Sequence, residues 1–230
     1  VQGKYLCEMI VTVLVVSILL NVFYQYSYEK DYLSEFENRN QALEALESGP
    51  DKEIKDLEDS SSSRYDQYKT GSYVNSAMYM GTNSTSYYFS VANGSISRFF
   101  DEMYLNTPWD YHYSSLDGRT ILDRLASVKY FAIRKNGYGY IPYGYDTETV
   151  FSGKYRIYEN ENDLPLGYTY NSWISRGKYE KLSVTQKQQA LLQGAVVEES
   201  SLPETELSFD DKKADFTLEA GKGCKIKDGK

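Results

Sequence analysis

The sequence predicts an α+β protein anchored in a membrane: an N-terminal transmembrane helix, an acidic helical stalk, and a small mixed β-sheet domain with packed helices. Residues 9–24 read MIVTVLVVSILLNVFY, and the chain that follows them is polar and tyrosine-rich. An acidic stretch comes next, and after it segments with helix-type and strand-type patterns alternate. Such mixed patterns are typical of helices packed on a sheet.

The apolar run predicts the membrane helix. Counted from residue 5 to residue 24, it has about the 20 residues that a helix needs to cross a bilayer. Lys4 precedes the run, which favours a cytoplasmic N-terminus. We therefore expect residues 1–25 to span a bacterial cytoplasmic membrane, with the bilayer contacted through residues 5–24 and the chain after about residue 29 extracytoplasmic.

Two other interpretations of this run are open. A cleaved signal peptide would end at a small-residue cleavage site, but Tyr24 and Gln25 stand at the end of this run. A buried helix of a globular protein is the other alternative. Because the chain begins at Val1 rather than Met, we expect it to be a fragment with further membrane segments upstream.

An acidic stalk is expected over residues 26–63. Between Glu29 and Asp59 there are 11 acidic and 4 basic residues, a net charge of −7 in a chain of net charge −8. Apolar residues at helical spacing predict a helix over residues 29–47, and a second, short helix is expected over residues 52–57. The serine run of residues 60–63 is expected to form a flexible joint.

Several kinds of chemistry are not expected. The nearly neutral remainder of the chain offers no basic face, so no nucleic acid is expected as a partner. The two cysteines, Cys7 and Cys224, form no disulfide framework or paired-cysteine metal motif. With His112 as the single histidine, neither a metal site nor a histidine-dependent triad is predicted, and we expect no cofactor.

The compact domain is expected over residues 64–203. Patterns and caps predict helices over 95–105, 120–127 and 184–197. The expected N-terminal caps are Ser95, the pair Thr120 and Asp123, and either Ser183 with Gln186 or Thr185 with Gln188.

Strands are expected around these helices. VKYFAIRK carries apolar side chains on both faces and is therefore expected in the interior of the sheet. Further strands are expected in RYDQY and over residues 154–160 and 167–171. Pro203 is expected to close the domain, and residues 204–230 resemble the first strands of a further β-rich segment that the chain cuts short.

Tyrosine is unusually abundant, with 24 residues in the chain and 19 of them between Tyr65 and Tyr179. Tyrosine favours strands, so strand packing explains this density, and stacking on sugars is the functional alternative. The candidate sugar-stacking residues are Trp109, Tyr143, Tyr145, Tyr158 and Trp173.

Short blocks in a fixed order carry a family resemblance. LASVKYFAI is followed by IPYGY, then by YRIYENENDLPLGYTYNSWI and QKQQALLQGAVV. The pieces that match are Val128-Lys129-Tyr130, Pro142-Tyr143-Gly144, Tyr158-Glu159-Asn160, Leu164-Pro165-Leu166-Gly167 and Leu191-Leu192, and Arg64-Tyr65-Asp66 and SYYFSVAN look like earlier blocks. Over about residues 60 to 200, the chain resembles the extracytoplasmic region of bacterial YfhO-like membrane proteins.

The resemblance implies a large polytopic membrane protein of the GT-C glycosyltransferase type. Such proteins use lipid-linked sugars outside the membrane, and family members are linked to adding sugars to lipoteichoic acid or related surface polymers. The acidic residues expected to carry that chemistry lie in an early extracytoplasmic loop, and no position of this sequence matches that motif. The resemblance therefore implies no catalytic residue in this chain.

Two functions are favoured by these observations, and a third, a sensor ectodomain, is weaker because no signalling domain is visible in the sequence. The first is an extracytoplasmic accessory domain of such a glycosyltransferase, whose partner is a surface glycopolymer or a lipid-linked sugar. The second is a surface binding or adhesion module held by one signal-anchor helix and without enzymatic activity. Further apolar segments in the complete reading frame would favour the first.

Overall fold

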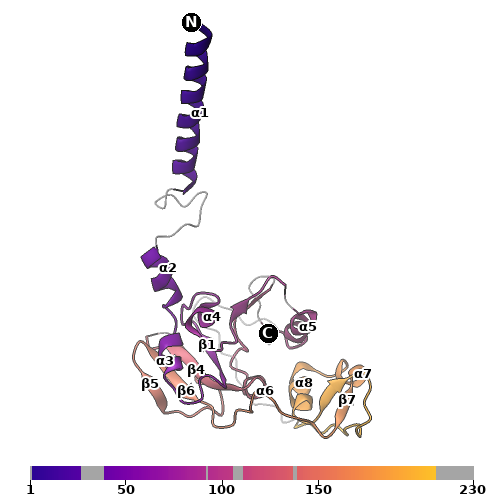
Figure 1. Ribbon diagram of the computed structural model, residues 1–230. Coiled ribbons are helices and arrows are strands. Elements are labelled where there is room, and N and C mark those ends of the chain that lie inside the picture. The colour runs from indigo at the N-terminus through magenta and orange to yellow at the C-terminus, as the bar shows by residue number, and fades with distance from the viewer. Residues whose placement is uncertain (1, 27–38, 92, 106–110, 137–138, 211–230) are drawn as a thin grey trace, which may run out of the picture. The chain divides into compact units, whose positions relative to one another are not determined.

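The computed structural model describes residues 2–26, 39–91, 93–105, 111–136 and 139–210. Its chain divides into two compact units. The first comprises Val1–Asp101 and Leu105–Gly167, and the second comprises Glu102–Tyr104 and Tyr168–Lys230. Figure 1 follows the elements in chain order. Helices and small mixed sheets alternate, which confirms the α+β prediction.

Helix α1 (Gln2–Tyr26) contains the apolar run. Its segment Gly3–Gln25 is long and apolar enough to cross a membrane, with a mean hydropathy of 2.4 and none of it buried in protein. The hydroxyl of Thr12 donates to the Glu8 carbonyl at 2.8 Å, so this polar side chain is satisfied within the helix itself. The prediction of a membrane-length helix is confirmed.

Two short helices precede the sheet of the first unit, α2 (Arg39–Leu46) and α3 (Asp51–Lys55). They replace the longer helices expected over 29–47 and 52–57, of which residues 29–38 lie outside the described part. Asp51 and Ile54 of α3 are buried. Beyond them, the Ser63 hydroxyl donates to the Asp59 carbonyl at 2.9 Å, so the serine run ends in a hydrogen-bonded turn.

The main sheet has four strands in the spatial order β1-β4-β6-β5. Strands β1 and β4 pair in parallel, and the other two pairs are antiparallel. The strands are β1 (Arg64–Tyr68), β4 (Val128–Arg134), β6 (Tyr155–Glu159) and β5 (Thr149–Ser152). Strand β4 therefore lies in the interior, as its two apolar faces predict.

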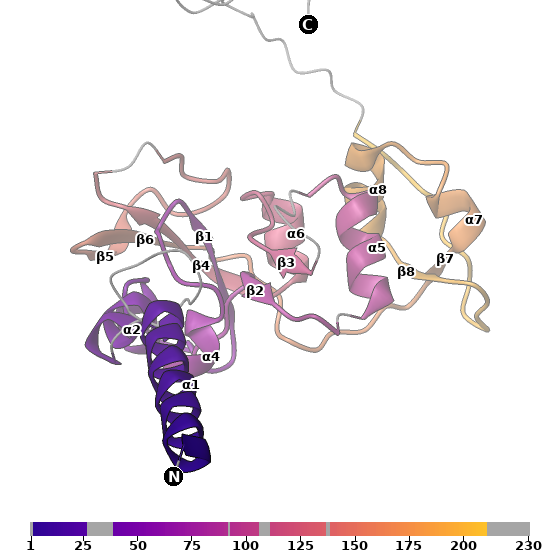
Figure 2. The ribbon, with the colours of Figure 1, turned by 90° about the horizontal axis from the view of Figure 1, so that it is seen from above.

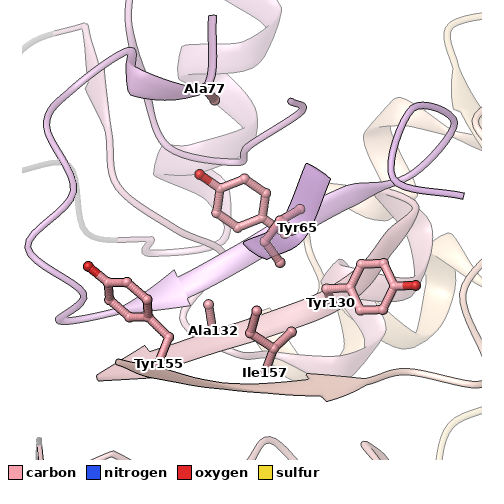
Figure 3. Close-up of a cluster of buried hydrophobic side chains, with 7 residues drawn as sticks. Tyr65, Ala77, Tyr130, Ala132, Tyr155 and Ile157 are labelled. Carbon is pink, nitrogen blue, oxygen red and sulfur yellow. The ribbon is translucent and has the colours of Figure 1, made fainter. Parts of the chain in front are cut away.

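Alternating side chains of β4 enter two separate core clusters. Tyr130 and Ala132 join the cluster that contains Tyr65 and Ile157, which Figure 3 shows in close-up. Phe131 and Ile133 join the other cluster. Because successive side chains of a strand point to opposite faces, β4 contributes to the core on both sides of the sheet.

Short elements complete the first unit. They are α4 (Ser76–Met80), β2 (Tyr87–Tyr88), α5 (Gly94–Glu102), β3 (His112–Tyr113) and α6 (Thr120–Leu125). The last residue of α5, Glu102, is assigned to the second unit. Strands β2 and β3 form an antiparallel pair. Both expected helices in this region exist, and each is shorter than predicted.

Their predicted caps were wrong. At α5 the side chain of Asn93, not Ser95, accepts a hydrogen bond, from the Ser95 amide at 2.9 Å. Ile96 of α5 is exposed, whereas Phe100 is buried. At α6 the Thr120 hydroxyl donates to the Tyr143 carbonyl, and no side chain caps the helix. At α6, contacts with residues distant in the sequence replace the expected capping box of Thr120 and Asp123.

The second unit contains β7 (Trp173–Ser175), α7 (Arg176–Tyr179), α8 (Val184–Leu191) and β8 (Ala195–Val197). Strands β7 and β8 pair in parallel. The strand expected over 167–171 was wrong, because β7 begins only at Trp173. The expected helix over 184–197 ends at Leu191, and its last three residues form β8 instead.

The capping box of α8 is confirmed. The Ser183 side chain accepts from the Gln186 amide at 3.3 Å, and the Gln186 side chain accepts from the Ser183 amide at 3.1 Å. Past Pro203, Glu204 forms an isolated parallel bridge with Trp173. Most of the predicted β-rich segment, from residue 211 on, lies outside the described residues.

Candidate functional site

The five predicted sugar-stacking residues lie in different environments. Trp109 lies outside the described residues. Tyr143 is 92% exposed, whereas Tyr145 and Tyr158 are buried together in the second core cluster. Trp173 is half-buried on β7 of the second unit. Among the described candidates of the first unit, Tyr143 is therefore the side chain that is open to a ligand without rearrangement.

A tight turn separates the exposed from the buried tyrosine. Gly144 has a φ of +86°, a conformation that L side chains rarely adopt, and the Tyr145 amide donates to the Pro142 carbonyl at 3.3 Å. The turn directs Tyr143 to solvent and Tyr145 into the core. There the Tyr145 hydroxyl donates to Asp123 Oδ2 at 3.1 Å.

A pocket of about 190 Å³ with a mixed polar and apolar lining lies beside β1, where α4 and the chain before β2 meet it. The residues that line it include Arg64, Thr82, Ser84, Ser86 and Tyr87. They contribute one guanidinium, four hydroxyls and one aromatic ring. The sequence did not predict this pocket, because no motif marks its lining residues and the fold alone brings Arg64 next to residues 75–87.

Hydrogen bonds hold the walls of the pocket. The Asn75 side chain donates to the Tyr88 carbonyl at 3.0 Å and accepts from the Tyr88 amide at 2.8 Å, so it clamps α4 to β2. Tyr87 stacks on Tyr113 with ring centroids 4.7 Å apart. The walls are thus positioned before any ligand arrives, which lowers the ordering cost of binding.

Arg64 has donors to spare at this site. One of its guanidinium nitrogens donates to the Ala126 carbonyl at 2.8 Å. Within the part of the chain that the structure describes, no carboxylate pairs with this guanidinium. An arginine with unused donors is suited to contact hydroxyls or phosphate oxygens.

A buried carboxylate, Asp51, supports the pocket from behind. It accepts hydrogen bonds from the hydroxyls of Tyr65 at 2.7 Å, Ser76 at 2.8 Å and Thr82 at 2.6 Å. Thr82 also lines the pocket. Because both oxygens of Asp51 are occupied, its arrangement is that of a structural hub rather than a general base.

Two further carboxyls, Asp66 and Asp123, are fully buried on the other side of β1. Burial raises the pKa of Asp66 to about 6, although the Thr85 hydroxyl donates to it at 2.6 Å. Burial and the nearby Asp66 charge raise the pKa of Asp123 to about 9. Among the described residues, nothing hydrogen-bonds Asp123 Oδ1 and no acidic, histidine or cysteine cluster could hold a metal.

Comparisons with known proteins agree with the membrane helix. The family model described as "Bacterial membrane protein YfhO" matches residues 1–224. The chain belongs to the YfhO family. A Bacillus subtilis (strain 168) protein described as "Uncharacterized protein YfhO" is 27% identical over 178 residues, which cover 76% of this chain.

The matched part of that Bacillus protein is 20% of its length, so the chain spans about a fifth of this YfhO relative. No solved structure matches the chain. The family match and the N-terminal apolar helix make this a membrane protein. The mixed sheet, the pocket and the two units described above therefore belong to a YfhO-family chain.

Proposed function

We propose that the region after α1 is an extracytoplasmic accessory domain of a bacterial membrane glycosyltransferase-like protein. The parent protein would be of the GT-C type and would add sugars to lipoteichoic acid or a related surface polymer. The observation that carries this proposal is the family match over residues 1–224 together with the membrane-length helix Gly3–Gln25. A polar, tyrosine-rich domain next to such a helix suits contact with a surface polymer.

The role of this chain in that reaction is binding rather than chemistry. The best-supported acceptor site is the pocket beside β1, since hydroxyls and an aromatic ring suit a hydroxyl-rich ligand. Arg64 would contact phosphate groups between sugar or polyol units. Tyr143 is proposed as an outer stacking contact for a longer polymer, whereas Tyr145 and Tyr158 would need to leave the core first. Trp173 is proposed as a separate stacking contact on the second unit.

Topology is the first test of the proposal. Lys4 before the apolar run favours a cytoplasmic N-terminus, so the chain after about residue 29 should be outside. A reporter that works only in the cytoplasm, fused after Ser63 of the complete protein, should be inactive. Activity of that reporter would overturn the extracytoplasmic assignment.

Binding is the second test. The chain in lipid nanodiscs is titrated with glycosylated and bare teichoic-acid fragments while amide shifts are followed. Ser86→Phe should fill the pocket and weaken binding, whereas Ser90→Phe, an exposed position outside the pocket lining, should bind like the parent. Equal binding by both variants would show that the pocket is not the binding site. If neither teichoic-acid fragment binds, the domain is a spacer rather than a binding domain.

An assay of transferase activity distinguishes an accessory domain of a glycosyltransferase from an adhesion module. We expect the chain alone to transfer no sugar, because no position of it matches the acidic motif that the family resemblance implies. Deleting residues 64–203 from the complete protein should reduce glycosylation of the surface polymer. Unchanged glycosylation combined with lost surface binding would favour the adhesion module instead.

A further inference from the structure

One stretch of the first unit differs from the rest of this acidic chain. From Gln67 to Phe100 there is no Asp or Glu, and Lys69 and Arg98 are its two charged residues. The chain as a whole carries a net charge of −8. The stretch itself therefore adds no negative charge to the surface that it forms.

Large apolar side chains are exposed in the same stretch. Between 45% and 78% of each of six side chains is accessible, namely Tyr73, Met78, Tyr79, Tyr88, Phe89 and Val91, and we call these six the aromatic surface. Large apolar side chains that lie next to one another on a surface are typical of a binding site. Tyrosine, phenylalanine and methionine beside basic residues are a composition that suits the boundary between lipid headgroups and acyl chains.

The two halves of the aromatic surface are held next to each other. One half comes from α4 and the residues before it, and the other comes from β2 and the residues after it. The double hydrogen bond between the Asn75 side chain and the Tyr88 backbone, at 3.0 and 2.8 Å, joins them. Figure 2 shows α4 and β2 as neighbours.

The residues that connect the two halves of the aromatic surface lie along one edge of the main sheet. Residues 83–85 run beside β1, with the Tyr65 amide donating to the Asn83 carbonyl at 2.9 Å. Strand β1 is the first in the sheet order and β5 is the last. Exposed residues of β5, such as Val150, therefore mark the opposite edge.

Helix α1 keeps this surface close to the membrane that the helix crosses. Helix α1 ends at Tyr26 and α2 begins at Arg39. However the intervening residues are arranged, a connection of this length reaches at most about 45 Å, since an extended chain spans about 3.5 Å per residue. The bilayer is therefore always within reach, at a high effective concentration.

We propose that the aromatic surface docks on the outer face of the same bilayer that α1 crosses. The six apolar side chains enter the headgroup region, and Lys69 and Arg98 face anionic headgroups. Apolar insertion drives the contact, because two basic residues add little at physiological salt. The docked domain would present the pocket beside β1 at the level of the headgroups, since Met78 belongs to both.

The test compares two valines of the same chain. In a background that carries Cys7→Ser and Cys224→Ser, Val91→Cys or Val150→Cys is labelled with an environment-sensitive fluorophore. Each labelled chain is placed in a nanodisc of phosphatidylethanolamine and phosphatidylglycerol, one chain per disc. At position 91 the emission should be about twofold stronger than at position 150, because the interface excludes water. Shallow nitroxide lipids should quench position 91 alone.

Three results would overturn the proposal. Equal emission at both positions would show that the surface faces water. Strong emission at position 91 without quenching by nitroxide lipids would show that protein rather than lipid covers it. Quenching at both positions would show an unspecific collapse onto the bilayer.

A second variant separates docking from folding. Tyr79→Ser combined with Phe89→Ser, in the chain labelled at position 91, should return the emission to the value of position 150. Both side chains are exposed, so the circular-dichroism melting curve should stay that of the parent. An unchanged emission in this double variant would contradict insertion through the aromatic surface.

Discussion

The hydroxyl of Tyr65 lies 2.7 Å from Oδ1 of Asp51, and both residues are almost completely buried. Asp51 belongs to α3, which precedes the sheet, and Tyr65 belongs to its first strand. Burial, together with this carboxylate, raises the pKa of the Tyr65 hydroxyl well above its usual range. The contact ties a helix of the predicted acidic stalk to the sheet, so α3 packs with the domain.

Asp51→Ala should destabilise the chain by about 3 kcal/mol or more, because each unpaired buried hydroxyl costs about 1–3 kcal/mol. Three hydroxyls would lose their acceptor, those of Tyr65, Ser76 and Thr82. The free energy of unfolding from denaturant titration in detergent measures the change. The matched control is Asp56→Ala, an exposed acid one turn further on, which should stay within about 0.5 kcal/mol. Similar losses of unfolding free energy in both variants would contradict the role of Asp51 as the acceptor that holds the three hydroxyls.

Ile133→Asp should cost several kcal/mol. Ile133 lies in the interior strand β4 and is 1% exposed, so the carboxylate would be buried without a partner. Thermal melting of the chain checks the effect. Ile141→Asp, at an exposed isoleucine a few residues later, serves as the control and should melt like the parent. A neutral effect at position 133 would mean that β4 is not central to stability.

The buried carboxyls predict that stability falls as pH rises. Asp66 and Asp123 have folded-state pKa values of about 6 and about 9, above the ordinary value of 3.8. Between 3.8 and these values the folded chain holds protons that the unfolded chain has released. The contribution of these two carboxyls to the free energy of unfolding is therefore greatest below about pH 4. As the pH rises toward the folded-state pKa values, the free energy of unfolding falls by up to about 1.4 kcal/mol per pH unit for each of the two groups.

Asp123→Asn should flatten this dependence above pH 6. The amide stays neutral, and its oxygen can still accept from the Tyr145 hydroxyl. Denaturant titrations between pH 5 and pH 9 give the slope directly. The exposed Asp146→Asn is the control and should keep the slope of the parent. An unaltered slope in Asp123→Asn would show that Asp123 is not the titrating group.

Ser183→Ala should destabilise the second unit by about 1 kcal/mol, the usual cost of losing an N-terminal cap. The variant removes the acceptor of the Gln186 amide at the start of α8. Hydrogen exchange of the α8 amides measures the loss locally. Ser201→Ala, outside any helix or strand, should leave these exchange rates unchanged. Unchanged protection in Ser183→Ala would show that packing alone holds α8.

Some features followed from the sequence because their causes are local. The span Gly3–Gln25 depends on composition and length alone, since about 20 consecutive apolar residues suffice to cross a bilayer. The interior place of β4 followed from apolar side chains on both faces, and the start of α8 followed from Ser183 and Gln186. Each of these signals is complete within a single stretch of chain.

Other features came from residues distant in sequence that compete with local preferences. Thr120 has the sequence of a helix cap, but it bonds the Tyr143 carbonyl, and Asp123 bonds the Tyr145 hydroxyl. The last residues of the predicted helix over 184–197 form β8, because they gain ladder hydrogen bonds with β7. Helix propensity is weak enough for such pairing to outweigh it.

The candidate site likewise combines features that local sequence predicts with features that long-range contacts decide. Tyrosine density alone suggested sugar stacking, and two positions of one motif, Tyr143 and Tyr145, were proposed together. The φ of +86° at Gly144 sends the first to solvent and the second into the core. The pocket beside β1 exists because Asn75 and Asp51 bind groups far along the chain. Residue types determined which chemistry was available, and long-range hydrogen bonds decided which side chains a ligand can reach, because burying an unpaired polar group costs more than a local pattern gains.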